Sequence, residues 1–221
     1  MGGRDGGNSV PGCFVTFEGI DGAGKTTQLH KVATWLREQG ISLEVTREPG
    51  GTPLGEEIRR LLLKERYDIE QRAEVLLYAS ARAQHVEERI RPALDAGKWV
   101  LCDRFTDASI AYQAYGLGAP LHWVREVNRF ATGGLSPHRS YLFDLPIEVS
   151  RSRLSHRPRQ GELDRVDRME ERSDRYFERV REGFLQLARE EGQRMVLLDA
   201  RESEEQVFQK ICRDLKHWLS A

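Results

Sequence analysis

A glycine-rich stretch near the start of the chain has the residue types and spacing that hold phosphate groups. Positions 19–26 read Gly-Ile-Asp-Gly-Ala-Gly-Lys-Thr and fit the pattern G-x-x-x-x-G-K-[ST] in full. Glycines let backbone N–H groups converge on phosphate oxygens, and a helix that begins at Lys25 adds its positive end. Lys25 can reach the terminal phosphates as a catalytic cation, and the Thr26 hydroxyl can ligate Mg²⁺. The predicted ATP site comprises Gly19, Ile20, Asp21, Gly22, Ala23, Gly24, Lys25, Thr26 and Thr27.

A carboxylate further along the chain is a second candidate for this site. Asp103 follows a short apolar run, Trp99–Cys102, which is typical of a strand buried on both faces. A carboxylate at the end of such a strand can hold Mg²⁺, although alone it could equally be a cap or the partner of Arg104. Together with the glycine-rich loop, Thr26 and Asp103 predict a metal site, with Mg²⁺ as the cofactor and ATP as the phosphoryl donor.

Alternating strands and helices must position these residues. The strands are predicted at Cys13–Glu18, Ser42–Arg47, Trp99–Cys102, Tyr141–Phe143 and Met195–Leu198. The main helices are predicted at Lys25–Gln39, Glu70–Leu94, Asp107–Tyr115, Leu121–Ala131 and Ser203–Leu219. This alternation predicts an α/β protein with the P-loop NTPase fold, in which a five-stranded parallel sheet carries helices on both faces.

The composition bounds the class of protein. The 221 residues suit one domain, residues 13–221, after a flexible tail at 1–12. A net charge of −1 predicts no nucleic-acid or membrane partner, and no run of about 18 apolar residues occurs. The three cysteines form neither a metal pattern nor a disulfide framework, so we expect a cytoplasmic enzyme.

Four blocks of sequence resemble bacterial thymidylate kinases, and the resemblance covers about residues 13–215. The blocks are FEGIDGAGKTTQ at Phe17–Gln28, TREPGGTPLGEEIR at Thr46–Arg59, AEVLLYASAR at Ala73–Arg82 and DRFTDASIAYQ at Asp103–Gln113. The resemblance implies a homodimeric nucleoside-monophosphate kinase that transfers the γ-phosphoryl of ATP to dTMP, giving dTDP and ADP in dTTP synthesis.

The same resemblance implies roles for individual residues in the dTMP site. Arg47 and Arg104 would hold the acceptor phosphate, with Arg104 also catalytic, and Asp21 would meet the sugar 3′-hydroxyl. Tyr112 would pack under the sugar. The base would be stacked, read or contacted by Tyr78, Arg82, Ser109 and Gln113. The i, i+4 spacing of Tyr78 and Arg82 independently places both on one helix face.

An irregular segment at about 155–167 interrupts the alternation and predicts a small mobile lid. Six arginines (151, 153, 157, 159, 165 and 168) stand against acidic residues at 162, 164 and 167, a local excess of three positive charges. The glycine-rich loop offers no cation besides Lys25. We therefore expect the lid to supply a catalytic arginine in cis, from Arg157, Arg159 or Arg165.

Alternatives remain open at this point. A glycine-rich loop of this kind specifies the phosphoryl donor rather than the acceptor, so another nucleoside-monophosphate or nucleoside kinase fits as well. A GTPase-like switch would need an N-K-x-D element, which the sequence lacks. A catalytically inactive structural protein would have no reason to retain Lys25, Thr26, Asp103 and Arg104 together.

Overall fold

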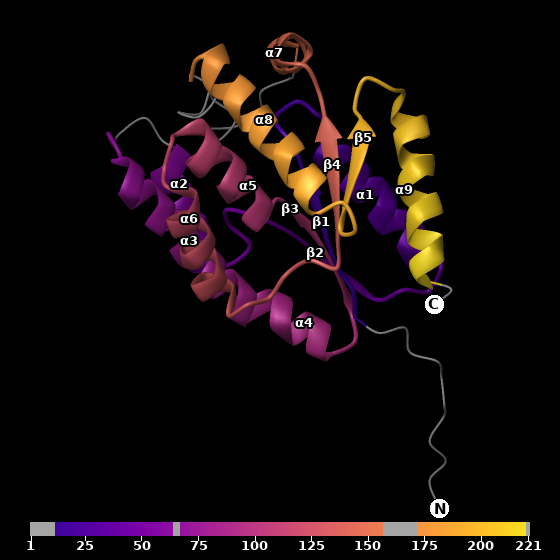
Figure 1. The fold of residues 1–221 in the computed structure, drawn as a ribbon. Helices are drawn as coiled ribbons and strands as arrows, with labels where there is room; N and C mark the ends of the chain where they lie inside the picture. Colours follow the sequence, from indigo (N-terminus) through magenta and orange to yellow (C-terminus); the bar gives the residue numbers. More distant parts are fainter. Residues whose placement is uncertain (1–11, 64–66, 157–171, 220–221) are drawn as a thin grey trace, which may run out of the picture.

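A five-stranded parallel sheet forms the centre of the computed structural model (Figure 1), which describes residues 12–63, 67–156 and 172–219. The strands are β1 (Phe14–Glu18), β2 (Leu43–Arg47), β3 (Trp99–Asp103), β4 (Arg139–Asp144) and β5 (Met195–Asp199). They lie in the order β2-β3-β1-β4-β5 and all pair in parallel. The predicted fold class is confirmed.

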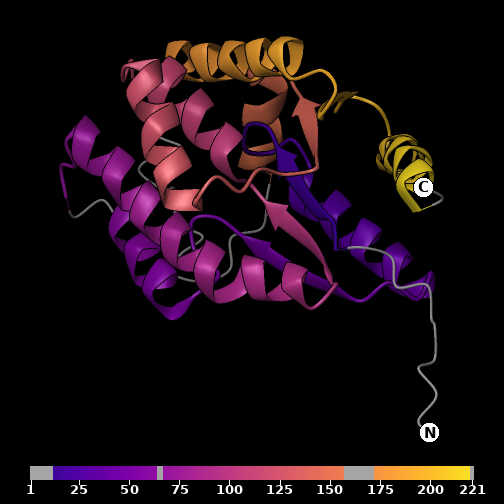
Figure 2. The ribbon, with the colours of Figure 1, turned by 60° about the horizontal axis from the view of Figure 1, so that its bottom comes forward.

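Helices cover both faces of this sheet. They are α1 (Lys25–Glu38), α2 (Pro53–Leu63), α3 (Gln71–His85), α4 (Arg91–Asp95), α5 (Thr106–Ser109), α6 (Leu121–Thr132), α7 (Ile147–Ser155), α8 (Asp174–Glu190) and α9 (Glu204–Leu219). In Figure 1, α1 and α9 lie on one side of the strands, whereas α3, α5 and α8 lie on the other. Figure 2 shows the same separation, with α8 in orange above the strands and α1 in indigo below them. None of the described helices is long and apolar enough to cross a membrane.

The central strand β1 is buried along its whole length, as its apolar sequence predicts. Phe14 meets Phe105 edge to face, with ring centroids 4.9 Å apart. Phe17, whose side chain points to the opposite face, packs against Tyr141 and Phe143. Both faces of the sheet therefore contribute to the core, and the strand carries the loop that follows it on a rigid support.

The parallel register brings the ends of three strands together. Phe17 of β1 pairs with Asp103 of β3, and Arg47 of β2 pairs with the same residue. The glycine-rich loop leaves β1 one residue later, after Glu18. Because ligands of parallel α/β sheets bind beyond the carboxyl ends of the strands, this edge is where the fold places a site.

Two predicted helices contain wider turns than expected. The predicted helix Glu70–Leu94 is α3 and α4 joined by a π-helical segment, Val86–Ile90. Pro92 lacks an amide hydrogen and cannot donate the bond of a regular α-helix, which accounts for the wider turn before it. Likewise, Asp107–Tyr115 is α5 followed by a π-helical segment, Ile110–Gly116.

The predicted lid and tail fall mostly on parts of the chain that are not described. Arg157, Arg159 and Arg165 lie outside the described residues, as do residues 1–11 of the tail. Of the predicted lid at 155–167, only Ser155 and His156 are described, at the end of α7.

Candidate active site

The glycine-rich loop wraps around the ammonium group of Lys25. Gly19 and Gly24 take positive φ angles of 135° and 89°, which L-residues with side chains rarely adopt. A Cβ atom at Gly19 would also lie 2.6 Å from the carbonyl oxygen of Phe143. Lys25 is 6% exposed and donates from Nζ to the Ile20 carbonyl at 2.9 Å. The backbone therefore turns tightly around Lys25 at the start of α1, where the sequence predicts the phosphate cradle.

The charge state of Lys25 is set by its surroundings. Burial and the nearby guanidinium of Arg104 lower the pKa of Lys25 to about 8, although the carboxylates of Asp21 and Asp103 act in the opposite direction. Its Nζ lies 4.0 Å from Asp21 Oδ1. Burial disfavours the charged form of Lys25, and the phosphate oxygens of a bound nucleotide would stabilise that form.

Two oxygen donors meet at the predicted metal site. The Thr26 hydroxyl donates to Asp103 Oδ2 over 2.5 Å, joining the first turn of α1 to the end of β3. A hydroxyl and a carboxylate suit Mg²⁺, which prefers oxygen ligands and takes few of them from protein. In residues 12–63, 67–156 and 172–219 no group of three or more His, Cys, Asp or Glu side chains could hold a metal alone. The pair therefore fits a metal that is also bound to nucleotide phosphates.

Arg104 joins the phosphate loop to a second pocket. Its backbone has a φ of 71°, and its guanidinium donates to the Gly19 carbonyl at 2.9 Å, to Asp21 Oδ1 at 2.7 Å and to the Tyr112 hydroxyl at 3.1 Å. Burial alone would raise the pKa of Asp21, but Arg104 and Lys25 outweigh it and hold the pKa at about 2. Asp21 is thus an anion between two cations.

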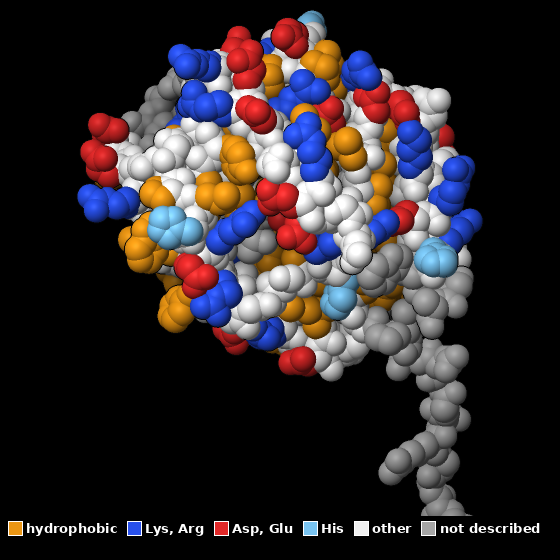
Figure 3. Space-filling view, in the orientation of Figure 1, with side chains coloured by type: hydrophobic (Ala, Val, Ile, Leu, Met, Phe, Trp, Pro, Cys, Tyr) orange, Lys and Arg blue, Asp and Glu red, His pale blue; other side chains and the backbone are white. Residues whose placement is uncertain are grey.

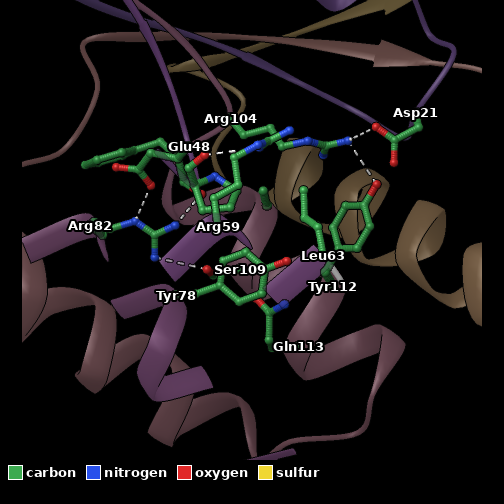
Figure 4. Close-up of a pocket in the computed structure, with 13 residues that line it drawn as sticks. Asp21, Glu48, Arg59, Leu63, Tyr78, Arg82, Arg104, Ser109, Tyr112 and Gln113 are labelled. Carbon is green, nitrogen blue, oxygen red and sulfur yellow. Dashed lines mark hydrogen bonds and ion pairs between the residues drawn. The ribbon is translucent and has the colours of Figure 1, made fainter. Parts of the chain in front are cut away.

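The second pocket holds about 570 Å³ of open space, its mouth included, and Figure 4 shows its lining. Seven of the eight predicted dTMP-site residues line it, namely Asp21, Tyr78, Arg82, Arg104, Ser109, Tyr112 and Gln113. The exception is Arg47. The sequence therefore predicted much of a pocket whose walls come from the loops after β1, β2 and β3, from α2, α3 and α5, and from the π-helical segment after α5.

Arg82 is part of the pocket wall and is only 2% exposed. It donates from Nε to Glu48 Oε2 at 2.7 Å, and its two terminal nitrogens donate to Ser109, Asn128 and the Phe105 carbonyl at 3.0, 2.5 and 3.1 Å. A guanidinium has five N–H groups. Among the described residues four of them are therefore engaged, which leaves one for a ligand.

Another part of the wall presents an acceptor. Gln113 is 2% exposed, and its Nε2 donates to Glu74 Oε1 at 3.4 Å. Its Oε1 is buried, and no group among the described residues donates to it. In Figure 4 the Gln113 amide lies near the Tyr78 ring and Ser109. A buried acceptor without a protein donor is costly, and an N–H of a ligand in the adjoining pocket would satisfy it.

Six wall residues were missing from the sequence prediction, namely Glu48, Pro49, Arg59, Leu63, Phe105 and Ala108. Glu48 bridges Arg82 and His85, Phe105 lies under the Arg82 guanidinium at 5.4 Å, and Leu63 adds apolar surface. Arg59 of α2 lines both this pocket and the cleft along the phosphate loop. Glu48 and Arg59 lie inside the block Thr46–Arg59, so a signal existed, but only the fold shows which of its charges face the pocket.

Arg47 lies in the neighbouring cleft instead. That cleft is lined by Lys25, Thr26, Asp103 and Arg47, and it shares Asp21, Glu48, Arg59 and Arg104 with the pocket. Arg47 is 53% exposed and pairs with Glu56 at 3.1 Å. The two cavities are therefore contiguous, and their shared residues mark where two sets of phosphates would meet.

A glycine-rich phosphate loop joined through Arg104 to a second pocket is the arrangement expected of a P-loop nucleoside-monophosphate kinase, and the comparisons with known proteins show that class. The family model for thymidylate kinase matches residues 17–211. The chain belongs to the thymidylate kinase family.

Individual relatives agree with this assignment. The chain is 50% identical to a thymidylate kinase of Exiguobacterium sibiricum over 211 residues, which cover 95% of this chain and 97% of that protein. It is 48% identical to a thymidylate kinase of Carboxydothermus hydrogenoformans over 200 residues, covering 90% and 95%. The crystal structure of thymidylate kinase from Ehrlichia chaffeensis superposes with a TM-score of 0.74 at 30% identity, covering 93% and 99%.

Proposed function

We propose that the pocket binds dTMP, that the adjoining cleft binds ATP with Mg²⁺, and that the chain transfers the γ-phosphoryl group between them to give dTDP and ADP. The observation that carries this proposal is the polar wall of the pocket. Gln113 offers a buried acceptor and Arg82 one remaining donor. The thymine edge presents one N–H beside carbonyl oxygens, which matches this pair.

The acceptor phosphate would lie where the two cavities meet. Arg59 and Arg104 line both cavities, and Arg47 lies next to them in the cleft. Planar guanidinium groups suit a dianionic phosphate because each offers two parallel N–H donors. In this arrangement Tyr78 stacks on the base and Ser109 lies at its edge. Tyr112 packs under the sugar, and Asp21 accepts from the sugar 3′-hydroxyl.

Transfer needs alignment and charge neutralisation rather than a general base, because the acceptor phosphate is already ionised at neutral pH. Thr26 and Asp103 would hold Mg²⁺, which supplies positive charge to the nucleotide phosphates when it is bound. Lys25 holds the terminal phosphates of ATP, and Arg104 keeps the acceptor beside the loop.

We retain the proposal that a lid at about 155–167 supplies a further cation from Arg157, Arg159 or Arg165. Its support is the sequence: Gly22 and Ala23 leave the loop without a second cation. An arginine that contacts the transferring group contributes about 10³–10⁵ in turnover. One of the three Arg→Ala variants should therefore lose more than about a hundredfold in kcat, with dTMP affinity unchanged. Parental turnover in all three and in the triple variant would contradict the proposal.

The remaining proposals concern assembly and location. Trp123 and Phe130 of α6 are 62% and 89% exposed, and Leu76 of α3 is 57% exposed. Figure 3 shows hydrophobic side chains on the left of the molecule, where Figure 1 shows α3 and α6. Such apolar exposure supports a homodimer, which sedimentation of the parent chain and of Phe130→Glu would test. The cysteines are buried and free, in keeping with a cytoplasmic enzyme.

The function is tested by a panel of acceptors with ATP and Mg²⁺. We expect dTMP to have the highest kcat/KM and dCMP a value at least about tenfold lower, because cytosine leaves the Gln113 acceptor unpaired. Thymidine and AMP in the same panel separate the alternative nucleoside and nucleoside-monophosphate kinases. Equal rates on dTMP, dCMP and AMP would overturn the assignment.

A further inference from the structure

The orientation of one amide decides what kind of base the pocket accepts. Gln113 can present either its carbonyl oxygen or its NH₂ group to a ligand, because the two ends of an amide have nearly the same shape. With the oxygen facing the base, the ligand must donate. With the NH₂ group facing it, the ligand must accept, and the preference would be reversed. Something in the protein therefore has to hold the amide one way round.

Glu74 of α3 is placed to do this. It is fully buried, and its Oε1 lies 3.4 Å from Gln113 Nε2, across the boundary between α3 and the π-helical segment that carries Gln113. An ionised carboxylate has acceptors only. The amide end that faces it must be the NH₂ group, since two oxygens at this distance would repel each other. The carbonyl oxygen of Gln113 is thereby directed away from Glu74.

A second contact fixes the carboxylate itself. Arg172 donates from its guanidinium to Glu74 Oε2 at 2.9 Å and lies over the Tyr176 ring at 4.6 Å. This ion pair offsets the buried charge, and Oε1 of the same carboxylate lies within hydrogen-bonding distance of the Gln113 amide. The order of contacts is therefore Arg172, Glu74, Gln113 and then the ligand.

We propose that Glu74 is a positioning residue that sets the base specificity of the acceptor site: by holding the Gln113 amide with its oxygen toward the pocket, it makes the site demand an N–H at the ring position that Gln113 meets. This inference rests on the proposed function, because it takes the pocket as the nucleotide acceptor site. It places the origin of the specificity in a residue that does not line the pocket.

The two pyrimidine classes should respond differently to Glu74. Thymine and uracil share the imide N–H and satisfy the Gln113 oxygen. Cytosine has a bare ring nitrogen there, so two acceptors would face each other and both would lose their hydrogen bonds with water. Glu74 should therefore penalise dCMP and leave the choice between dTMP and dUMP unaffected.

The test is Glu74→Gln in the full chain, assayed with ATP and Mg²⁺ on dTMP, dUMP and dCMP. A glutamine at this position can donate or accept, so the Gln113 amide is free to turn. We expect the ratio of kcat/KM for dTMP to that for dCMP to fall by about tenfold, while the ratio for dTMP to dUMP stays constant. Parallel losses on dTMP and dCMP would show that Glu74 is merely structural and would overturn the proposal.

Two further variants separate positioning from a general disturbance. In a Gln113→Ala background, Glu74→Gln should leave the dTMP to dCMP ratio unchanged, because the amide that it orients is gone. The exchange Glu74→Gln with Gln113→Glu should restore the preference for dTMP, because a carboxylate at 113 presents only acceptors. A change of ratio in the Ala background, or no recovery in the exchange variant, would contradict the proposal.

Folding and function are monitored in the same series. Glu74→Gln with Arg172→Met removes both charges together and replaces the single variant if that variant unfolds below assay temperature. The parent chain is measured first. A parent with no preference for dTMP would overturn the proposed function itself, whereas a parental preference that survives Glu74→Gln would overturn only the role of Glu74.

Discussion

The pocket wall and the phosphate cleft lie side by side but are built in opposite ways. In the wall, Arg82 and Glu48 are 2% and 5% exposed, and most of their hydrogen-bonding groups pair with each other and with neighbouring elements. In the cleft, Arg47 is 53% exposed, and Lys25 keeps a charge that burial disfavours. The wall is a mostly paired network that leaves one donor of Arg82 and the Gln113 acceptor open, whereas the cleft holds charges that an anionic ligand would neutralise.

This difference indicates a division of labour. A mostly paired buried network holds its remaining donors and acceptors in place before a ligand arrives, so it can discriminate between bases. A group of cations contributes little to the recognition of a base's shape, but it stabilises the negative charge that develops on the phosphoryl group during transfer. Changes to the wall should therefore affect stability and base choice, and changes to the cleft should affect turnover.

The largest expected effect is on the wall. Arg82→Ala leaves the buried carboxylate of Glu48 without its guanidinium partner, and we expect the free energy of unfolding to fall by about 3–5 kcal/mol. Denaturant unfolding measures this loss. Arg60→Ala is the matched control, because the exposed pair with Glu57 at 2.6 Å should contribute at most about 0.5 kcal/mol. Equal losses in both variants would remove the distinction between a buried wall and an open surface.

Next is the loss of the loop cation. Lys25→Ala should lower kcat by at least about a hundredfold, since a single contact to developing charge is typically worth that much. The unfolding midpoint should not fall, because burial already disfavours this charge. Lys31→Ala, on the same helix and paired with Glu204, should keep parental turnover. Near-normal turnover of Lys25→Ala would show that the cleft is not where transfer occurs.

A smaller effect is expected at the metal pair. Asp103→Asn keeps the shape of the side chain and an acceptor for the Thr26 hydroxyl but removes the charge. The Mg²⁺ concentration for half-maximal rate should rise by about ten- to a hundredfold, as for other supporting metal ligands. Asp95→Asn, at the exposed end of α4, is the control. A parental Mg²⁺ dependence in Asp103→Asn would place the metal elsewhere.

The smallest effect is a pH dependence of the cleft. The pKa of Lys25 is about 8, below its ordinary value of 10.5. Above pH 8 the free enzyme loses this positive charge, so kcat/KM for ATP should fall by at most about tenfold per pH unit. This decline of kcat/KM above pH 8 should be absent from the Lys25→Arg variant, however low its activity is, because a guanidinium does not titrate in this range.

Stability should change in the other direction over the same range. Between pH 8 and 10.5 the unfolded chain holds the Lys25 proton more tightly than the folded chain does, so the contribution of this group to the free energy of unfolding increases with pH. Circular dichroism across the same pH range is the control. If kcat/KM declined because the protein unfolds, the loss of structure would appear over the same pH values.

The sequence predicted the fold and most of the pocket but missed specific charges. The loop at 19–26 and the spacing of Tyr78 and Arg82 are local patterns, and the structure places both at the site. Arg47 and Arg59 lie in one block of sequence, yet the fold places only Arg59 in both cavities. Which charged side chain of such a block faces the site depends on the elements that pack against it. Those elements come from distant parts of the sequence, so the block alone does not specify it.

The sequence by itself determined which residues form the glycine-rich loop and which segments form the strands. Glycine spacing and apolar periodicity are patterns among neighbouring residues, so they can be recognised without the fold. Only the tertiary structure decided that Arg82 is a buried part of the wall. Its partners Glu48 and Asn128 are 34 and 46 residues away, and a guanidinium can be buried only where such distant acceptors converge. The proposed direction of the Gln113 amide depends in the same way on a distant group, the carboxylate of Glu74 on another helix.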